Sequence, residues 1–206
     1  MNLDRNHIEF KAWPKTARLL RNIVITEKID GTNAAIQIVD AETYSPLQGT
    51  ATVILDGKQY YVHAQSRKRL IRVGDDNFGF AAWVWDNANQ LAQILGPGTH
   101  YGEWWGRGIQ RGYNTLNRHF SLFNTAKWKG LSEVVGGETL THVPVLYEGV
   151  FDQAVIEETL IDLQRDGSVA SLDYPNPEGI CVYHTQSNTV YKVTLDNNDA
   201  GKWENS

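Results

Sequence analysis

The chain lacks most of the features that mark secreted, zinc-binding and membrane proteins. Its one cysteine, Cys181, rules out an internal disulfide and favours a reducing, cytoplasmic setting. Its six histidines show no metal-ligand spacing with one another or with Cys181, which argues against a zinc site. No apolar run approaches the roughly 18 residues of a membrane span, and the N-terminus carries no basic-then-apolar secretion signal. We therefore expect a cytoplasmic protein without a membrane partner.

The chain also has no internal repeat, no low-complexity tract and no linker rich in proline, glycine or serine. Its 206 residues, of which 41% are hydrophobic and 21% charged, suffice for one well-buried globular domain. We expect residues 1–206 to form a single domain, and the protein to be a monomer.

A net charge of −5 argues, taken alone, against a nucleic-acid partner. The charge is unevenly distributed, however: residues 1–66 are neutral, residues 67–129 carry +5 and residues 130–206 carry −10. The basic middle third could present a surface that attracts phosphates, or it could be a solvated face without function. Charge alone leaves both interpretations open.

Apolar periodicity and turn residues predict an α+β fold with mainly antiparallel sheets. Gly31, Asp56-Gly57 and Ser187-Asn188 mark turns between paired strands. The expected strands are residues 23–26, 35–39, 50–55, 59–64, 100–105, 119–124, 143–151, 179–184 and 189–195. The expected helices are residues 80–95, stopped by Pro97-Gly98, and residues 152–165, capped by Asp152 and ended by Gly167.

The first chemical signal is residues 27–33 (EKIDGTN), in which Lys28 ends a strand just before an Asp-Gly turn. A nucleophilic amine must be neutral, whereas a free lysine titrates near ~10.4. Desolvation or a nearby divalent metal can supply the required destabilisation of the ammonium, roughly 4 to 5 kcal/mol. The alternative is an ordinary hairpin with an exposed lysine, because a four-residue pattern recurs by chance.

Five further segments follow in order: residues 65–67 (QSR), 101–110 (YGEWWGRGIQ), 119–124 (HFSLFN), 177–182 (PEGICV) and 191–194 (YKVT). Together with the lysine segment they resemble the motifs of the covalent nucleotidyltransferase superfamily, which contains the ATP-dependent ligases and capping enzymes. The Gly-Thr-Asn after the lysine and the Gly-x-Gly-Ile-Gln tail of residues 106–110 are similar to the RNA ligase 2 branch. The resemblance spans residues 23 to 194.

The resemblance implies a fold and a site. It implies an α+β nucleotidyltransferase domain, an ATP-grasp-like ligase adenylation domain of antiparallel sheets with flanking helices. Many such ligases carry a further C-terminal domain or an OB-fold, but only 14 residues follow Lys192, so we expect no OB-fold and no C-terminal accessory domain here. The implied catalytic residues are Lys28, Asp30, Glu103, Glu178 and Lys192, with Asp30, Glu103 and Glu178 as metal ligands. The implied nucleotide-binding residues are Glu27, Gly31, Asn33, Arg67 and Phe123, and the implied RNA-binding residues are Arg107, Gln110 and Arg111.

Two features depart from the pattern or leave a role open. The last motif is expected as Lys-x-Lys, but Thr194 stands at the second lysine, which removes a cation that would grip a phosphate. Trp104 and Trp105 could either contact the nucleic acid or pack in the core. Phe120 and Cys181 we assign to the core.

The implied function is ATP-dependent joining of RNA 3′-hydroxyl and 5′-phosphate ends through a lysyl-adenylate and an adenylylated 5′ end, with Mg²⁺ or Mn²⁺. The expected partners are nicked or templated RNA ends, as in RNA repair, and a protein partner for end sealing. The alternatives are a minimal DNA ligase, a partner-dependent adenylyltransferase, and a non-catalytic module that binds nucleotide or nucleic acid.

Overall fold

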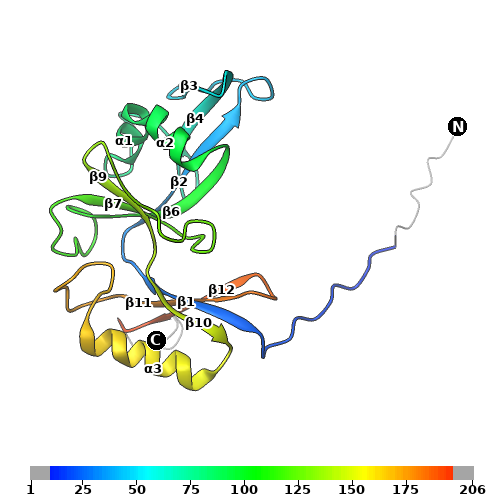
Figure 1. The fold of residues 1–206 in the computed structure, drawn as a ribbon, viewed down its shortest axis with the longest axis vertical. Coiled ribbons are helices and arrows are strands. Elements are labelled where there is room, and N and C mark those ends of the chain that lie inside the picture. The colour runs from blue at the N-terminus through cyan, green and yellow to red at the C-terminus, as the bar shows by residue number, and fades with distance from the viewer. Residues whose placement is uncertain (1–9, 197–206) are drawn as a thin grey trace, which may run out of the picture.

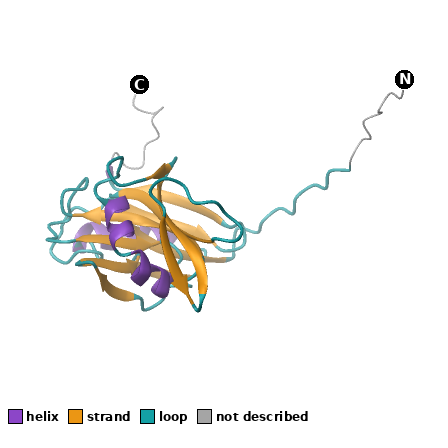
Figure 2. Cartoon of the chain, turned by 90° about the horizontal axis from the view of Figure 1, so that it is seen from above, coloured by secondary structure: helices purple, strands orange, loops and turns teal. Residues whose placement is uncertain are grey.

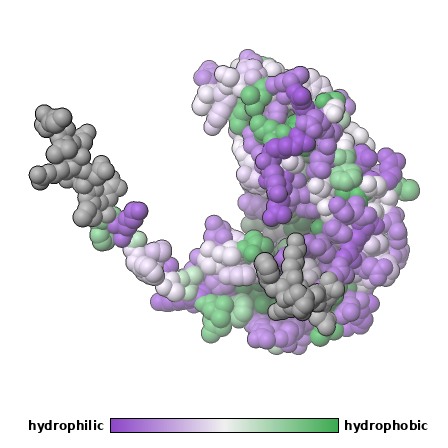
Figure 3. Space-filling view, turned by 180° about the vertical axis from the view of Figure 1, so that it is seen from behind, coloured by the Kyte–Doolittle hydropathy of each residue, from purple (hydrophilic) through white to green (hydrophobic). Residues whose placement is uncertain are grey.

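The computed structural model describes residues 10–196, which build two β-sheets and three helices (Figure 1). The sheets lie one above the other, and a space-filling view shows the molecule hollowed between them (Figure 3). The expectation of an α+β fold with mainly antiparallel pairing is confirmed, because β7 and β9 form the one parallel pair in the described part of the chain.

The lower sheet has four strands and is covered on one face by helix α3. Its order is β10 (Val145–Val150), β1 (Asn22–Lys28), β11 (Gly179–His184) and β12 (Thr189–Thr194). Ile23 and Ile25 of β1 pack with Leu163 of α3 (Gln153–Asp166) in its core. Asp152 begins this helix as predicted, since its carboxylate accepts a hydrogen bond of 2.9 Å from the Ala154 amide.

The upper sheet has eight strands and is covered on one face by helices α1 and α2. Its order is β3 (Ala51–Leu55), β4 (Lys58–Ser66), β2 (Thr32–Asp40), β6 (Gly98–Gly106), β7 (Arg118–Leu122), β9 (Glu138–His142) and β8 (Ser132–Val135), with β5 (Leu70–Ile71) beside β4. Residues such as Ile36, Trp104 and Phe120 point into the core on the helix side. Strand alternation therefore turns Asn33, Glu103 and their neighbours toward the hollow.

The predicted helix over residues 80–95 is two helices, α1 (Phe80–Asp86) and α2 (Ala88–Leu95). Asn87 separates them: both its main-chain and its side-chain amide donate to the carbonyl of Trp83, at 3.1 and 2.8 Å. An asparagine side chain that binds backbone groups in this way competes with helix continuation. The apolar periodicity continues across the break, which is why the pattern alone predicts one helix.

The predicted pairing of residues 23–26 with residues 35–39 is wrong. Strand β1 belongs to the lower sheet and β2 to the upper sheet, so residues 29–31 are a crossover between sheets and not a hairpin turn. Both strands show the alternation of a hairpin, but each finds its partners far along the chain, β1 in β10 and β11, β2 in β4 and β6. Local pattern does not encode those partners.

A small third cluster joins the two sheets at the closed end of the hollow. Ile29 of the crossover packs there with Trp105, Tyr113 and Val143, all of them buried. The sheets are thus connected by apolar packing as well as by the chain itself.

The hairpin around Asp56-Gly57 and the last hairpin, β11–β12, are confirmed. Asp56 and Gly57 have φ values of 49° and 79°, the left-handed geometry of a two-residue hairpin turn. The strands β5, β8 and β9 were not predicted, and the β8–β9 pair turns at Gly136-Gly137, both with positive φ.

Residues 10–18 run away from the two sheets as an extended arm (Figure 2). No helix within residues 10–196 is long and apolar enough to cross a membrane.

One half-buried histidine allows a test of the packing in the upper sheet. His119 of β7 stacks on Trp105 with ring centroids 4.3 Å apart, and its Nε2 is buried without a partner in the described residues. Burial lowers the pKa of the imidazole, so the unfolded chain takes up a proton before the folded chain does as pH falls. The contribution of His119 to the free energy of unfolding is therefore fully present above the ordinary histidine pKa. It decreases as pH falls below that value, by at most about 1.4 kcal/mol per pH unit.

We expect His119→Phe, which keeps the stacking and removes the titration, to lose less stability than the wild type between pH 7.5 and 5.5. Urea unfolding at both pH values measures this. An equal loss of unfolding free energy in the wild type and in His119→Phe would contradict a lowered pKa of His119.

Candidate active site

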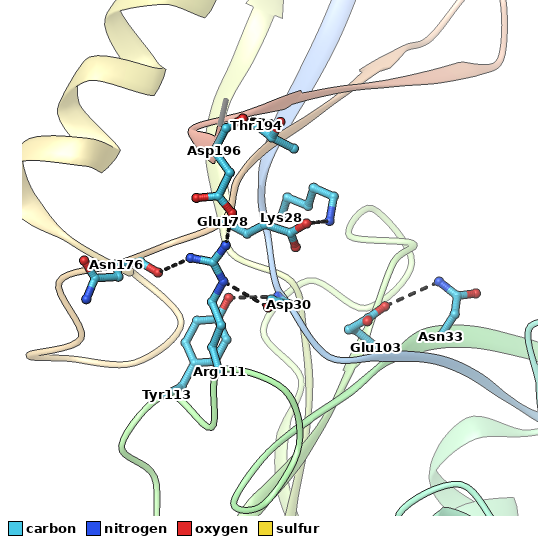
Figure 4. A network of polar contacts seen from close by, with 10 residues as sticks. All are labelled: Lys28, Asp30, Asn33, Glu103, Arg111, Tyr113, Asn176, Glu178, Thr194 and Asp196. Atoms are coloured by element: carbon cyan, nitrogen blue, oxygen red, sulfur yellow. Dashed lines mark hydrogen bonds and ion pairs between the residues drawn. The ribbon is translucent and has the colours of Figure 1, made fainter. Parts of the chain in front are cut away.

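Lys28 ends strand β1 on the side of the lower sheet that faces the hollow. Its Nζ forms an ion pair with Oε1 of Glu178, whose neighbour Gly179 begins β11 and pairs with Lys28 in the register of the two strands (Figure 4). The side chains of Lys28 and Glu178 are only 23% and 18% exposed. The lysine is therefore held in the site by an adjacent carboxylate, and the alternative of an exposed hairpin lysine is excluded.

Glu103 of β6 approaches the same place from the upper sheet. Burial raises the pKa of its carboxyl to about 7, against the opposing influence of the Lys28 charge and of hydrogen bonds from Asn33 and the Gly31 main chain. The amide of Asn33 donates to Oε2 of Glu103 at 3.4 Å. Because the charges of Lys28 and Glu178 both act on Glu103, the two sheets contribute to one electrostatic unit.

Gly31 is where the crossover passes closest to the upper sheet. A Cβ at this position would lie 2.5 Å from the Trp104 carbonyl oxygen and 2.7 Å from Cβ of Trp105. The first of these atoms is main chain and cannot move aside. Glycine is thus required by the close approach, and this approach sets the position of Lys28 three residues earlier.

Asp30 is held by Arg111, as Figure 4 shows. The Nε of Arg111 donates to Oδ2 of Asp30 at 2.9 Å, and its other nitrogens bind the Asn176 carbonyl, at 3.0 Å, and the Asp196 carboxylate. The guanidinium thereby joins the crossover, the segment before Glu178 and the residues after β12. The structure places Arg111 in this internal network, while its expected contact with RNA stays a prediction.

Glu27, the residue before Lys28, faces the opposite side of the strand and is 1% exposed. Its carboxylate accepts hydrogen bonds from the Ser168 hydroxyl at 2.6 Å and from the amides of Val169 and Ala170 at 2.8 Å. Burial raises the pKa of this carboxyl, against those three bonds. The side chain is committed to the loop after α3, and the Glu27 amide donates to the Pro144 carbonyl at 3.0 Å, so the expected nucleotide contact of Glu27 stays a prediction.

Tyr113 braces the crossover, residues 29–31, through a hydrogen bond to the Asp30 main chain. Its hydroxyl accepts a hydrogen bond of 2.8 Å from the Asp30 amide, and its carbonyl accepts one of 2.7 Å from the Ser171 hydroxyl. Ser171 in turn donates its amide to Oγ of Ser168, at 3.1 Å. The loop 168–171 therefore binds Glu27 directly and is connected to Asp30 through Tyr113.

The carboxylates of Glu103 and Glu178 fit a magnesium or manganese ion. The expectation was a set of three carboxylates that included Asp30. Oε2 of Glu178 is buried and has no partner in the described residues, and Glu103 accepts a long bond of 3.4 Å from Asn33 and a bond from the Gly31 main chain. Within residues 10–196 no three His, Cys, Asp or Glu side chains lie together as a metal cluster, so the expected set with Asp30 is not assembled. Mg²⁺ commonly takes one or two carboxylates and completes its shell with water and substrate phosphates, which suits Glu103 and Glu178.

The remaining predicted residues lie within strand β12 or after the ends of β4, β6 and β7. Phe123 follows β7 and is 41% exposed, as a ring that is to stack on a base requires. Lys192 of β12 pairs with Cys181 in strand register and is exposed on the Lys28 side of the sheet. Arg67, Arg107 and Gln110 are exposed at the ends of β4 and β6, and Gln110 has a φ of 43°.

The structure decides two open assignments and corrects a third. Trp104 and Trp105 are fully buried: Trp104 stacks on Trp83, and the Trp105 indole donates to Oγ of Ser121 at 2.8 Å, so both are packing residues. Phe120 is buried as predicted. Cys181, assigned to the core, is partly exposed on the Lys28 face, where burial raises the pKa of its thiol and the charges of Lys28 and Glu178 also act on it.

Several residues of the site carry no signal in the sequence. Tyr113, Ser168, Ser171 and Asn176 lie in loops without a motif, and each acts through a main-chain group or through a contact with a distant segment. The structure marks Tyr113 by a left-handed backbone, with a φ of 51°, which a tyrosine in the sequence does not predict.

Three comparisons with known proteins bear on this geometry. A family model described as RNA ligase matches residues 21–194. No curated protein matches the sequence.

Among solved structures, the chain is similar to three variants of a Naegleria gruberi RNA ligase. A ligand-free variant has a TM-score of 0.50, and variants with ATP and manganese and with AMP and manganese each have 0.51, all at 16% identity. The matches cover 84%, 84% and 85% of this chain, but only 49%, 49% and 50% of those chains. The chain thus spans about half the length of these relatives, and the likeness is one of fold.

The brace at Tyr113 predicts a specific loss of stability. Tyr113→Phe leaves the Asp30 amide without its acceptor in a largely buried setting, which should cost about 1–2 kcal/mol in the free energy of unfolding. The matched control is Tyr183→Phe, whose hydroxyl binds Asn188 at an exposed position and whose loss should cost little. Denaturant unfolding of both variants measures the difference, and equal effects would show that Tyr113 does not brace the crossover.

Proposed function

Because the chain belongs to the RNA ligase family, we propose that it is an ATP-dependent RNA ligase that joins a 3′-hydroxyl to a 5′-phosphate with Lys28 as nucleophile. The observation that carries the proposal is the position of Lys28. Its amine lies against Glu178, and its charge acts on Glu103 of the other sheet. Lys28 ends strand β1, and the residues that follow it contact Trp104, Tyr113 and Arg111. A lysine that only faced solvent would need neither an adjacent carboxylate nor a backbone held in place after it.

In the first step the Lys28 nitrogen attacks the α-phosphorus of ATP. Before the attack the Lys28 ammonium gives one proton to water, which frees the nitrogen lone pair. The N–P bond then forms, the bond between the α-phosphorus and the pyrophosphate oxygen breaks, and the nitrogen releases its second proton to water as pyrophosphate leaves. Glu178 orients the amine before the attack through the ion pair. Holding the amine in this position replaces a bimolecular encounter by an oriented one, and that can supply several kcal/mol of the barrier reduction.

The phosphates carry charge that the site must offset. Glu178 Oε2 and Glu103 are the groups that would hold Mg²⁺ or Mn²⁺. Such an ion would neutralise phosphate charge during the transfer. Lys192, exposed on the Lys28 face of β12, would contact the α-phosphate, and Thr194 two residues on contributes no charge.

The nucleotide and the RNA end would occupy the hollow. Phe123 offers a ring to the adenine, Asn33 and Arg67 would contact the ribose or phosphates, and Gly31 allows close approach of the main chain. Arg107 and Gln110, exposed at the end of β6, would meet the RNA end. The adenylate then passes to the RNA 5′-phosphate, and attack by the 3′-hydroxyl expels AMP and seals the strand.

The basic residues of the middle third that are not paired with carboxylates support a polynucleotide as the substrate. Of the basic middle third, Arg69 is paired with Asp75 and Arg111 with Asp30. Arg67, Lys68, Arg107 and Lys129 are exposed and take part in no side-chain ion pair within residues 10–196, so they remain available for phosphates.

The first test is covalent labelling. With α-labelled ATP and magnesium, the wild type should retain label through a denaturing gel, and Lys28→Ala should fall to background because Lys28 is the proposed nucleophile. The matched control is Lys58→Ala, which removes an exposed lysine of β4 that is paired with Asp40 of β2. This variant should label normally. No label on the wild type would overturn both ligase and adenylyltransferase functions and leave the binding module.

The second test distinguishes the polymers. Nicked duplexes that differ only in having RNA or DNA on the 3′-hydroxyl side should be sealed at different rates, with RNA at least tenfold faster, about 1.4 kcal/mol in the barrier. Single-turnover sealing by the pre-adenylated enzyme measures both. Equal sealing of an all-DNA nick would favour a minimal DNA ligase.

A further inference from the structure

The face of the upper sheet that lines the hollow carries a second exposed aromatic ring, which the chemistry above does not use. The register Gly102–Leu122 sets Tyr101 of β6 opposite Phe123, and the Phe123 amide donates to the Tyr101 carbonyl at 3.0 Å. Tyr101 is 54% exposed. Within the described residues its ring stacks on no other ring, and its hydroxyl has no hydrogen-bond partner.

Tyr101 faces the hollow for a reason of strand geometry. It lies two residues before Glu103 on β6, and alternate residues of a strand share a face. The intervening strand positions turn into the core, where Trp104 packs against the helices. Tyr101 therefore shares the surface that carries Glu103 and Phe123.

Two glutamines lie on one side of the ring, Gln37 on the adjacent strand β2 and Gln65 on β4, the next strand beyond it. Ala35 of β2 pairs with Tyr101 on one side and with Gln65 of β4 on the other, and Gln37 lies one step along the same face. Gln37 donates its amide to Oε1 of Gln65. In the described part of the chain this leaves the Gln37 oxygen as a free acceptor and the Gln65 nitrogen as a free donor, the pair of groups that a base edge requires.

From this arrangement we propose that Tyr101, Gln37 and Gln65 form a second nucleobase subsite, which takes a base of the RNA beside the joint. The inference rests on the proposed function. Opposed side chains on neighbouring strands have Cβ atoms about 5 Å apart, so Phe123 and Tyr101 present two adjacent stacking surfaces. Sheets that bind single-stranded RNA use aromatic rings on their exposed face in this way.

ATP has one base, and Phe123 is the ring assigned to it. The second ring then serves a base of the polynucleotide, which at a nick or a free end has a face open for stacking. Stacking on an aromatic ring tolerates any base, whereas the two amide groups of the glutamines can favour one base edge over another. The subsite thus links the nucleotide pocket to the RNA path.

The test separates the two substrates of the enzyme. For Tyr101→Ala, Tyr101→Phe and Phe123→Ala we would measure the ATP dependence of adenylation, and then the RNA dependence of sealing on a nick that already carries the 5′-adenylate. Tyr44→Ala, an exposed aromatic in the loop before β3, is the control. Thermal melts check that each variant is folded.

For Tyr101→Ala we expect the RNA concentration for half-maximal sealing to rise about tenfold or more. This effect should exceed its effect on the ATP concentration for adenylation by at least that factor. Tyr101→Phe should restore sealing because it keeps the ring, and Phe123→Ala should show the opposite split. If Tyr101→Ala instead shifts ATP use as much as RNA use, the ring belongs to the ATP site and the proposal is overturned.

Abasic substitutions locate the base. Removal of one base near the nick should weaken sealing by the wild type but not weaken it further in Tyr101→Ala; additive losses at every position would also overturn the proposal. Should the wild type take up no label from ATP, the proposed ligase function fails. A gel shift of the nicked RNA duplex with wild type and Tyr101→Ala then still decides whether the ring binds RNA, since equal affinities refute it.

Discussion

The close approach of Gly31 to the Trp104 carbonyl is the constraint on which the rest of this molecule depends. The chain leaves the lower sheet at Lys28 and enters the upper sheet at Thr32, so three residues span the junction. With so short a span, the contact at Gly31 sets both the distance between the sheets and the place where the lysine stands. Ile29, packed with Trp105 and Tyr113, fills the space behind it.

Buried polar contacts hold this junction from both sides. A buried carboxylate such as Glu27 is costly unless its oxygens are bonded, and three donors from the loop after α3 satisfy it. Tyr113 and Arg111 do the same for the main chain and side chain of Asp30. Such networks specify one arrangement because a displaced member leaves its partners unsatisfied. The hollow can then hold charged groups such as Lys28 and Glu178 while the two sheets keep their separation.

Strand alternation gives each sheet two functions at once. In β6, Trp104 packs in the core while Glu103 and Tyr101 face the hollow, and in β1, Ile25 packs against α3 while Lys28 faces the hollow. The core face fixes the register, and the register in turn fixes which polar groups meet across the hollow. The acidic and basic parts of the sequence also lie on different parts of the fold. The acidic last third of the sequence includes α3 on the outer face, whereas Arg67 and Arg107 lie at strand ends of the upper sheet.

The sequence by itself determined the elements whose signals are local: the helix capped by Asp152, the hairpins at Asp56-Gly57 and Ser187-Asn188, and the motifs around Lys28, Glu103 and Glu178. Periodicity, capping and turn chemistry act over a few residues, so they can be read without a fold. Only the tertiary structure decided that β1 and β2 part into two sheets and that Asn87 divides a helix. It also showed that Asp30 binds Arg111 and does not join the other two carboxylates. Each of these depends on contacts between segments far apart in the chain, and no local pattern of residues specifies such partners.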